Sequence, residues 1–340
     1  MTNLPDNVMM KRKHWVDVLR GLCMMAILLH HTEVYYTDQT LTPYNLYLTD
    51  ALTIFFMVSG YLFYKESGFC LRKKMVSVAR SLLMPYFIFT LLMALPKALA
   101  HGYSTDWSTL LLPIITGQAS WFVAALCVAE PLFALTLWTG RGKLGPIILL
   151  GLSGLLISIG LSTDIPSYPW QLDNALQALC FMTLGYCYHR YEHVFNSFNR
   201  PSYLVLLFFL FMGIKIYVAT CGVDMYIHHI NISNYPIFFL DITVGGLLLA
   251  HLCKAVPAIR WTAWIAWTGS HSLVYYFLCG GIPLLSAHLF NAVGLGYDGR
   301  YPTVLLVYAT AYGLTTAATW AIYRYFPFVT GKSTRKRPAN

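Results

Sequence analysis

The sequence predicts an all-α polytopic membrane protein, a bundle of about ten transmembrane helices with both termini in the cytoplasm. Three observations predict this fold class. Of the 340 residues, 57% are hydrophobic and only 11% are charged, and the mean hydropathy is +0.56, so there are too few charges to cover a soluble fold. Apolar stretches long enough to cross about 30 Å of hydrocarbon recur along the chain. The lysines and arginines between them collect in alternate loops.

Each expected span is an apolar run of the length that a membrane helix needs, and its composition is apolar all round. In chain order the runs are 15–36, 45–64, 77–99, 119–139, 144–161, 172–189, 202–221, 236–255, 271–290 and 302–325. We expect one membrane domain over residues 15–325, flanked by basic cytoplasmic tails at 1–14 and 326–340. This organisation excludes a soluble enzyme, a nucleic-acid-binding module and a secreted disulfide domain.

The cations predict the orientation, because lysine and arginine collect on the cytoplasmic side of membrane proteins. Of the 23 lysines and arginines, 19 lie in the ends and loops that alternate spans place on one side. The opposite loops carry Arg300, and three more cations, Arg20, Lys97 and Lys215, lie within spans. The net charge of +9 therefore reports topology in a lipid bilayer and requires no nucleic-acid partner.

The first span is the most heavily loaded with ionisable side chains, namely Asp17, Arg20, His30, His31 and Glu33. Such groups cost a few kcal/mol each inside a membrane and therefore indicate function. Asp17 and Arg20 can pair on one helix face. Arg20 and His31 share a face about 16 Å apart along the axis, whereas His30 points about 80° away. A phosphate-binding cation with a general base explains this stripe; a snorkelling arginine and an interfacial histidine explain it too.

Other polar residues are candidates on weaker grounds. Glu130 lies in the middle of a span and needs a partner or a proton. Ser59 either faces a cavity or marks a close helix contact with its neighbour Gly60. A basic cluster that is denser than orientation requires either binds a phosphorylated donor or anionic lipid headgroups, and it comprises Arg72, Lys73, Lys74 and Arg80. The scattered cysteines and histidines have no metal-ligand spacing, so no metal is expected.

The motifs of the chain also occur in a recognisable order. The run DVLRGLCMMAILLHH contains an arginine, ten residues and a histidine, here Arg20 and His31. Further runs follow it in order, namely FFMVSGYLF, RSLLMPYF, SWFVAAL, CFMTLGYCYHR and TGSHSLVYYFL, and the likeness covers about residues 15 to 290. Together they resemble the acyltransferase 3 family of membrane acyltransferases, whose hallmark is this Arg–His spacing. Where many members carry a late histidine, this chain has Cys279 and Gly280.

The resemblance implies an O-acyltransferase of the bacterial cytoplasmic membrane. Such an enzyme moves an acyl group, usually acetyl, from cytoplasmic acyl-CoA to a hydroxyl of a cell-envelope glycan or lipid-linked sugar. Acyl-CoA would be a substrate, with no permanently bound cofactor. His31 would be the general base, Asp17 would fix Arg20, and Glu33 or Glu130 would orient the imidazole. The donor would be bound by Arg20, Ser59, Arg72, Lys73, Lys74 and Arg80.

Two other classes remain open on the sequence alone. A transporter or flippase for a polar or lipid-linked substrate could use the same buried charges, although it often shows matched broken helices in two halves. A non-catalytic membrane subunit of a polysaccharide assembly would also contain many spans. The sequence leaves open the acyl group, the acceptor, an acyl-enzyme intermediate and whether the chain forms a homo-oligomer.

Overall fold

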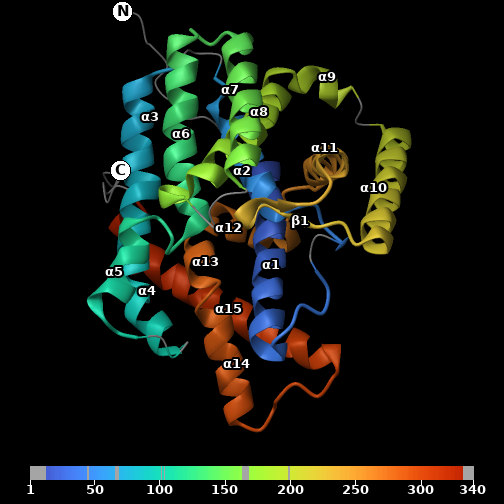
Figure 1. Cartoon of the computed structure of the whole chain (residues 1–340). Helices are drawn as coiled ribbons and strands as arrows, with labels where there is room; N and C mark the ends of the chain where they lie inside the picture. The colour runs from blue at the N-terminus through green and yellow to red at the C-terminus, as the bar shows by residue number, and fades with distance from the viewer. Residues whose placement is uncertain are drawn as a thin grey trace, which may run out of the picture.

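The computed structural model describes residues 13–43, 46–65, 69–100, 102, 104–162, 168–197 and 200–331. Most of both expected tails, residues 1–12 and 332–340, lies outside these described residues. Helices dominate the fold (Figure 1). They are α1 (His14–Thr37), α2 (Ala51–Phe63), α3 (Leu71–Val78), α4 (Met84–Ala100), α5 (Trp107–Ile115), α6 (Trp121–Thr139), α7 (Leu144–Leu161), α8 (Leu172–Arg190), α9 (Glu192–Asn196), α10 (Pro201–Cys221), α11 (Tyr235–Ala255), α12 (Arg260–Ser270), α13 (Ser272–Leu278), α14 (Ile282–Ala292) and α15 (Tyr301–Tyr325).

Short elements connect these helices. A π-helical turn, η2 (Ala79–Leu83), joins α3 to α4, and three 3₁₀ turns are η3 (Pro169–Gln171), η4 (His228–Ile230) and η5 (Pro327–Thr330). The strands β1 (Met225–Tyr226) and β2 (Asn231–Ile232) form a small antiparallel hairpin between α10 and α11. Aromatic side chains fill the main core among α2, α6, α8 and α11, including the fully buried Phe56, Phe133, Phe181 and Phe238.

All the expected apolar runs contain helix, so a helical membrane protein fits the structure. Within the described chain, six helical stretches are long and apolar enough to cross a membrane, namely α3 with η2 and α4, and α6, α7, α10, α11 and α15. The bent pair of α13 and α14 adds a seventh if it is one span. The count of ten and the cytoplasmic termini stay predictions.

The expected single helix over 271–290 is wrong, because the structure divides this run. Helices α13 and α14 meet at a bend of 48°. Gly280 and Gly281 lie in the break, and Pro283 occupies the first turn of α14, where its missing N–H costs no hydrogen bond. Helices α5 and α12 and the hairpin lie in segments that we expected to be loops.

Reciprocal glycine contacts join two pairs of helices, backbone against backbone. A Cβ at Gly60 of α2 would lie 1.9 Å from a backbone oxygen of α8, and one at Gly185 of α8 would lie 1.8 Å from a backbone oxygen of α2. Helices α1 and α12 meet in the same way at Gly21 and Gly269, where the distances would be 2.1 and 1.8 Å. Small residues permit this close packing, which is a main source of helix association in membranes.

Hydrogen bonds and ion pairs of Glu192 join the residue before α1 to the segment after α8 and to the last turn of α11. Glu192 accepts hydrogen bonds from Lys13 Nζ at 2.9 Å and Tyr61 Oη at 2.9 Å, and its other oxygen pairs with Lys254 Nζ at 2.9 Å. Burial opposes the ionisation of Glu192, but the hydrogen bonds from Lys254, Lys13 and Tyr61 outweigh it and lower its pKa from 4.5 to about 2. We name these residues the Glu192 cluster.

Candidate active site

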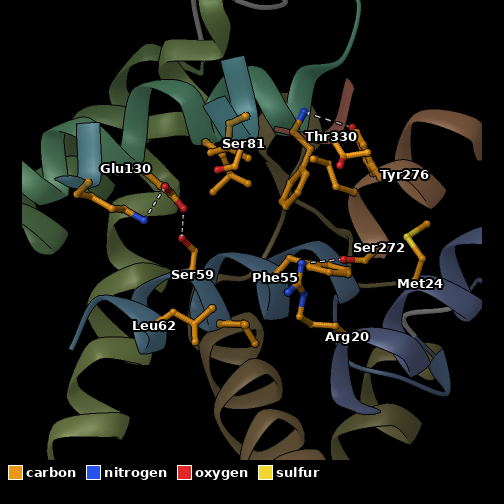
Figure 2. Close-up of a pocket in the computed structure, with 16 residues that line it drawn as sticks. Arg20, Met24, Phe55, Ser59, Leu62, Ser81, Glu130, Ser272, Tyr276 and Thr330 are labelled. Atoms are coloured by element: carbon orange, nitrogen blue, oxygen red, sulfur yellow. Dashed lines mark hydrogen bonds and ion pairs between the residues drawn. The ribbon is translucent and has the colours of Figure 1, made fainter. Parts of the chain in front are cut away.

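A cavity of about 280 Å³ lies among α1, α2, α3, η2, α6, α13 and η5 (Figure 2). Most of its wall is apolar, and it includes Met24, Phe55, Leu62, Leu82 and Phe122. Cations, hydroxyls and one carboxylate interrupt this wall. The polar lining consists of Arg20, Ser59, Lys74, Ser81, Glu130, Ser272, Tyr276 and Thr330. We name this space the Arg20 cavity.

Arg20 is held at the wall of the cavity by contacts with two neighbouring helices. Its Nη2 donates a hydrogen bond to Ser272 Oγ at 2.8 Å, which joins α1 to the start of α13 (Figure 2). The guanidinium carbon lies 5.8 Å from the centre of the Phe55 ring, close enough for a cation–π contact. The next residue, Gly21, packs on α12 and thereby fixes the height of Arg20. Asp17, one turn earlier, is buried.

Glu130 joins α6 to α2 and α3 on another wall of the cavity. Its Oε1 accepts a hydrogen bond from Ser59 Oγ at 2.6 Å, and its Oε2 pairs with Lys74 Nζ at 2.9 Å (Figure 2). The Lys74 ammonium also lies 3.9 Å from the centre of the Phe63 ring. A buried carboxylate requires such partners, because its desolvation otherwise costs several kcal/mol. The structure thus supplies the partner that the mid-span position of Glu130 demanded.

The cavity brings together only part of the predicted site. Four predicted residues from four helices line it, namely Arg20, Ser59, Lys74 and Glu130. The other residues of the basic cluster lie near Lys74 on α3 and η2 but do not line the cavity, namely Arg72, Lys73 and Arg80. The remaining predicted residues lie elsewhere on α1, namely Asp17, His31 and Glu33. Their roles stay predictions.

His31 lies on α1 about three turns beyond Arg20. Its ring stacks on Tyr35, with 5.9 Å between the ring centres, and approaches the His30 ring to 5.8 Å. Glu33 accepts hydrogen bonds from Tyr301 Oη at 2.5 Å and from the Thr42 N–H at 3.2 Å. No hydrogen bond joins His31 to Glu33 or Glu130 in the structure. The carboxylate that orients the imidazole therefore stays a prediction.

Sequence reasoning gave no role to several hydroxyls of the cavity. Ser272 and Tyr276 lie one turn apart on α13, and the Phe122 N–H donates a hydrogen bond to Tyr276 Oη at 3.4 Å. Thr330 belongs to η5, in the segment that we expected to be a basic tail, and it is buried. The apolar residues beside Thr330 could have indicated that this segment is folded, because a solvated tail is poor in apolar residues.

The donor set of the cavity suits an anionic or carbonyl ligand. Arg20 presents a planar fork of N–H donors and Lys74 a compact charge, and both can bind phosphate or carbonyl oxygen. The described residues contain no group of three or more His, Cys, Asp or Glu side chains that could hold a metal ion. The wall can therefore recognise a ligand by charge and hydrogen bonds, while its apolar part holds a thin uncharged segment.

Nearly the whole chain matches one known family. Residues 13–324 match the sequence profile of a family described as an acyltransferase domain, and this range includes every residue of the cavity except Thr330. No curated protein and no solved structure gives a significant match. With nearly the full length covered and the Arg20–His31 spacing in its first helix, the chain belongs to the acyltransferase 3 family.

Proposed function

We propose that this membrane acyltransferase moves an acetyl group from cytoplasmic acetyl-CoA to a hydroxyl of a cell-envelope glycan or lipid-linked sugar. Its family makes it an acyltransferase; the donor, the acceptor and the role of His31 are the proposal. The observation that carries it is the Arg20 cavity, in which cations from α1 and α3 face one narrow, mostly apolar space. The proposed location is the bacterial cytoplasmic membrane, where cytoplasmic acetyl-CoA and an envelope glycan meet on opposite sides of the bilayer.

The donor is proposed to enter the cavity from the side of α3. Acyl-CoA combines a highly charged nucleotide with a thin, nearly uncharged pantetheine arm. A space of about 280 Å³ suits the arm, so the phosphates stay at its mouth. Lys74 meets them there, since a phosphate can compete with Glu130 for the ammonium. Arg72, Lys73 and Arg80 supply further positive charge on the same segment.

The transfer step is proposed to take place beside His31. Arg20 and His31 lie about 16 Å apart along α1, a separation that an extended pantetheine arm can cover. His31 removes the proton of the acceptor hydroxyl while the hydroxyl oxygen attacks the thioester carbonyl carbon. The carbon–sulfur bond then breaks, and the sulfur takes up the proton from His31. Acyl transfer to the histidine itself would be an alternative route.

The direct test uses the purified protein with radiolabelled acetyl-CoA and an envelope-glycan extract. Label in the glycan, lost when Arg20 is replaced by alanine, supports acyl transfer. The surface variant Arg300→Gln provides the control, because the Arg300 side chain is 80% exposed. Movement of a glycan or lipid-linked sugar across vesicles without acetyl-CoA, and without label in it, would instead support a transporter or flippase.

A further inference from the structure

A second meeting point of helices lies at the far end of α1, where α13 breaks into α14. The break contains Cys279, Gly280 and Gly281. A Cβ at position 280 would lie 3.8 Å from Tyr35 Oη of α1, and a Cβ at position 281 would lie 2.6 Å from Met93 Cε of α4. Neighbouring backbone positions of the break therefore contact α1 on one side and α4 on the other.

Each of the two contacting side chains, Tyr35 and Met93, lies one helical turn from an ionisable residue. On a helix, residues four apart lie on the same face, which pairs Tyr35 with His31 on α1 and Met93 with Lys97 on α4. The His31 and Tyr35 rings stack, so these two side chains lie together. Lys97 is also near enough to the His31 ring and to Cys279 for its positive charge to act on both. His31, Lys97 and the break therefore lie near one another beyond Arg20 on α1, and we name them together the transfer region.

Lys97 differs from the other cations within the spans. Arg20 donates a hydrogen bond to Ser272, and Lys215 pairs with Asp241 at 2.7 Å. Lys97 forms no ion pair with a carboxylate of the described residues, and its side chain is exposed. A positive charge in the membrane domain with no countercharge in the described chain can stabilise a negative charge that develops during a reaction.

We propose that Lys97 is a catalytic residue, whose ammonium stabilises the oxyanion formed when the acceptor hydroxyl attacks the thioester beside His31. This rests on the proposed function. The new carbon–oxygen bond pushes the carbonyl electron pair onto oxygen, where Lys97 meets it, while the hydroxyl proton passes to His31. Collapse of the intermediate re-forms the carbonyl, breaks the carbon–sulfur bond and returns that proton to the CoA sulfur. Lys97 keeps its own proton throughout.

The test compares Lys97→Met, Lys97→Gln and Lys97→Arg in the full chain with labelled acetyl-CoA and glycan extract. Loss of an oxyanion-stabilising group lowers kcat by about 10²–10³-fold. We expect this loss in both neutral variants, with the KM for acetyl-CoA unchanged within about threefold, because Lys97 acts on the transition state. Lys97→Arg retains the charge, and its kcat should be at least tenfold higher than that of the two neutral variants. Arg300→Gln, at a surface cation on the same predicted side, should match the wild type.

Three results would overturn the assignment. A near wild-type kcat in Lys97→Met and Lys97→Gln shows that the charge is not used. A fall in activity that follows a lower melting temperature in all three variants shows a structural role. A higher KM at constant kcat shows that Lys97 only binds substrate. Absence of glycan labelling by the wild-type protein would instead contradict the proposed function. Labelling by the wild type that persists in the Lys97 variants would contradict only the role of Lys97.

Discussion

The Arg20 guanidinium carries both a charge and a planar fork of donors, and substitutions can separate the two. Arg20→Ala should lower kcat/KM by at least about 100-fold, because it removes a charge-assisted contact with the donor. Arg20→Lys keeps the charge but loses the fork, and it should recover activity only in part. Ser272→Ala removes one hydroxyl from Arg20, at about 1 kcal/mol, or roughly fivefold. Kinetics with labelled acetyl-CoA measure all three, and full activity of Arg20→Ala would contradict the donor site.

Adjacent histidines on α1 provide a matched pair for the general base. His31→Ala should abolish transfer, whereas His30→Ala should be mild, because only His31 shares the helix face of Arg20. The melting temperatures of both variants should stay close to the wild type, which excludes unfolding as the cause. Labelling of the glycan extract measures the difference. An essential His30 beside a dispensable His31 would mean that the wrong ring was assigned.

The charged residues of the cavity were predictable, whereas its hydroxyls, apart from Ser59, were not. Arg20 and Glu130 are conspicuous because an ionisable group inside a span is costly. Ser81, Tyr276 and Thr330 cost little in a helix, so their sequence positions carry no such signal. Lys74 lines the cavity and its neighbours do not, because the rotation of α3 about its axis depends on tertiary packing that the basic run does not encode.

At the scale of helices, the reciprocal glycine contacts predict a sharp dependence on one methyl group. Gly185→Ala and Gly269→Ala should each destabilise the protein by at least about 1–3 kcal/mol, because the new Cβ meets backbone that cannot rotate away. Gly213→Ala on α10 is the matched control, since no atom outside its own stretch of helix lies within 4 Å of its Cβ position. It should be neutral or slightly stabilising. Thermal unfolding in detergent measures the three variants, and equal melting temperatures would contradict the packing.

Hydropathy finds the long apolar helices of this chain but misses the short helices α5 and α12 and the bends between helices. The run 271–290 is apolar throughout, and only Gly280, Gly281 and Pro283 indicate that its backbone breaks. Glycine also occurs inside unbroken helices of the same chain, such as Gly313 of α15, so the residue alone does not decide. Helix α12 was missed because it is short and follows a span directly. Packing against α1 stabilises it, which a local pattern does not report.

At the scale of the molecule, the Glu192 cluster predicts an acid-dependent contribution to stability. The pKa of Glu192 is lowered by folding, from 4.5 to about 2. Its ionised form therefore stabilises the fold fully above about pH 4.5, and this contribution disappears as the pH falls towards 2. Glu192→Gln should lower the melting temperature at pH 7, and its difference from the wild type should shrink steadily below pH 4.5. A difference that stays constant with pH would contradict the ion pairs.

The number of spans is harder to predict than the fold class, for a reason linked to function. A span is identified by being long and apolar, yet α1 contains Asp17, Arg20 and Glu33. Helix α2 is short and contributes Ser59 to the cavity. Two of the helices that line the cavity, α1 and α2, thus depart from the composition or length of an ordinary membrane span, whereas α6 does not. Positive charges in alternate loops predicted ten spans by a separate argument.

The glycine contacts join the helices around the Arg20 cavity into two closely packed pairs. One pair is α1 with α12, which continues almost directly into α13, and the other is α2 with α8. Arg20 lies on the first pair, Ser272 on α13 directly after it, and Ser59 on the second pair. Because backbone meets backbone within each pair, we expect the cavity to adjust by movement of one pair relative to the other. Spin labels, one on each pair, should then change their separation on binding of CoA, while Arg20 and Ser272 stay together.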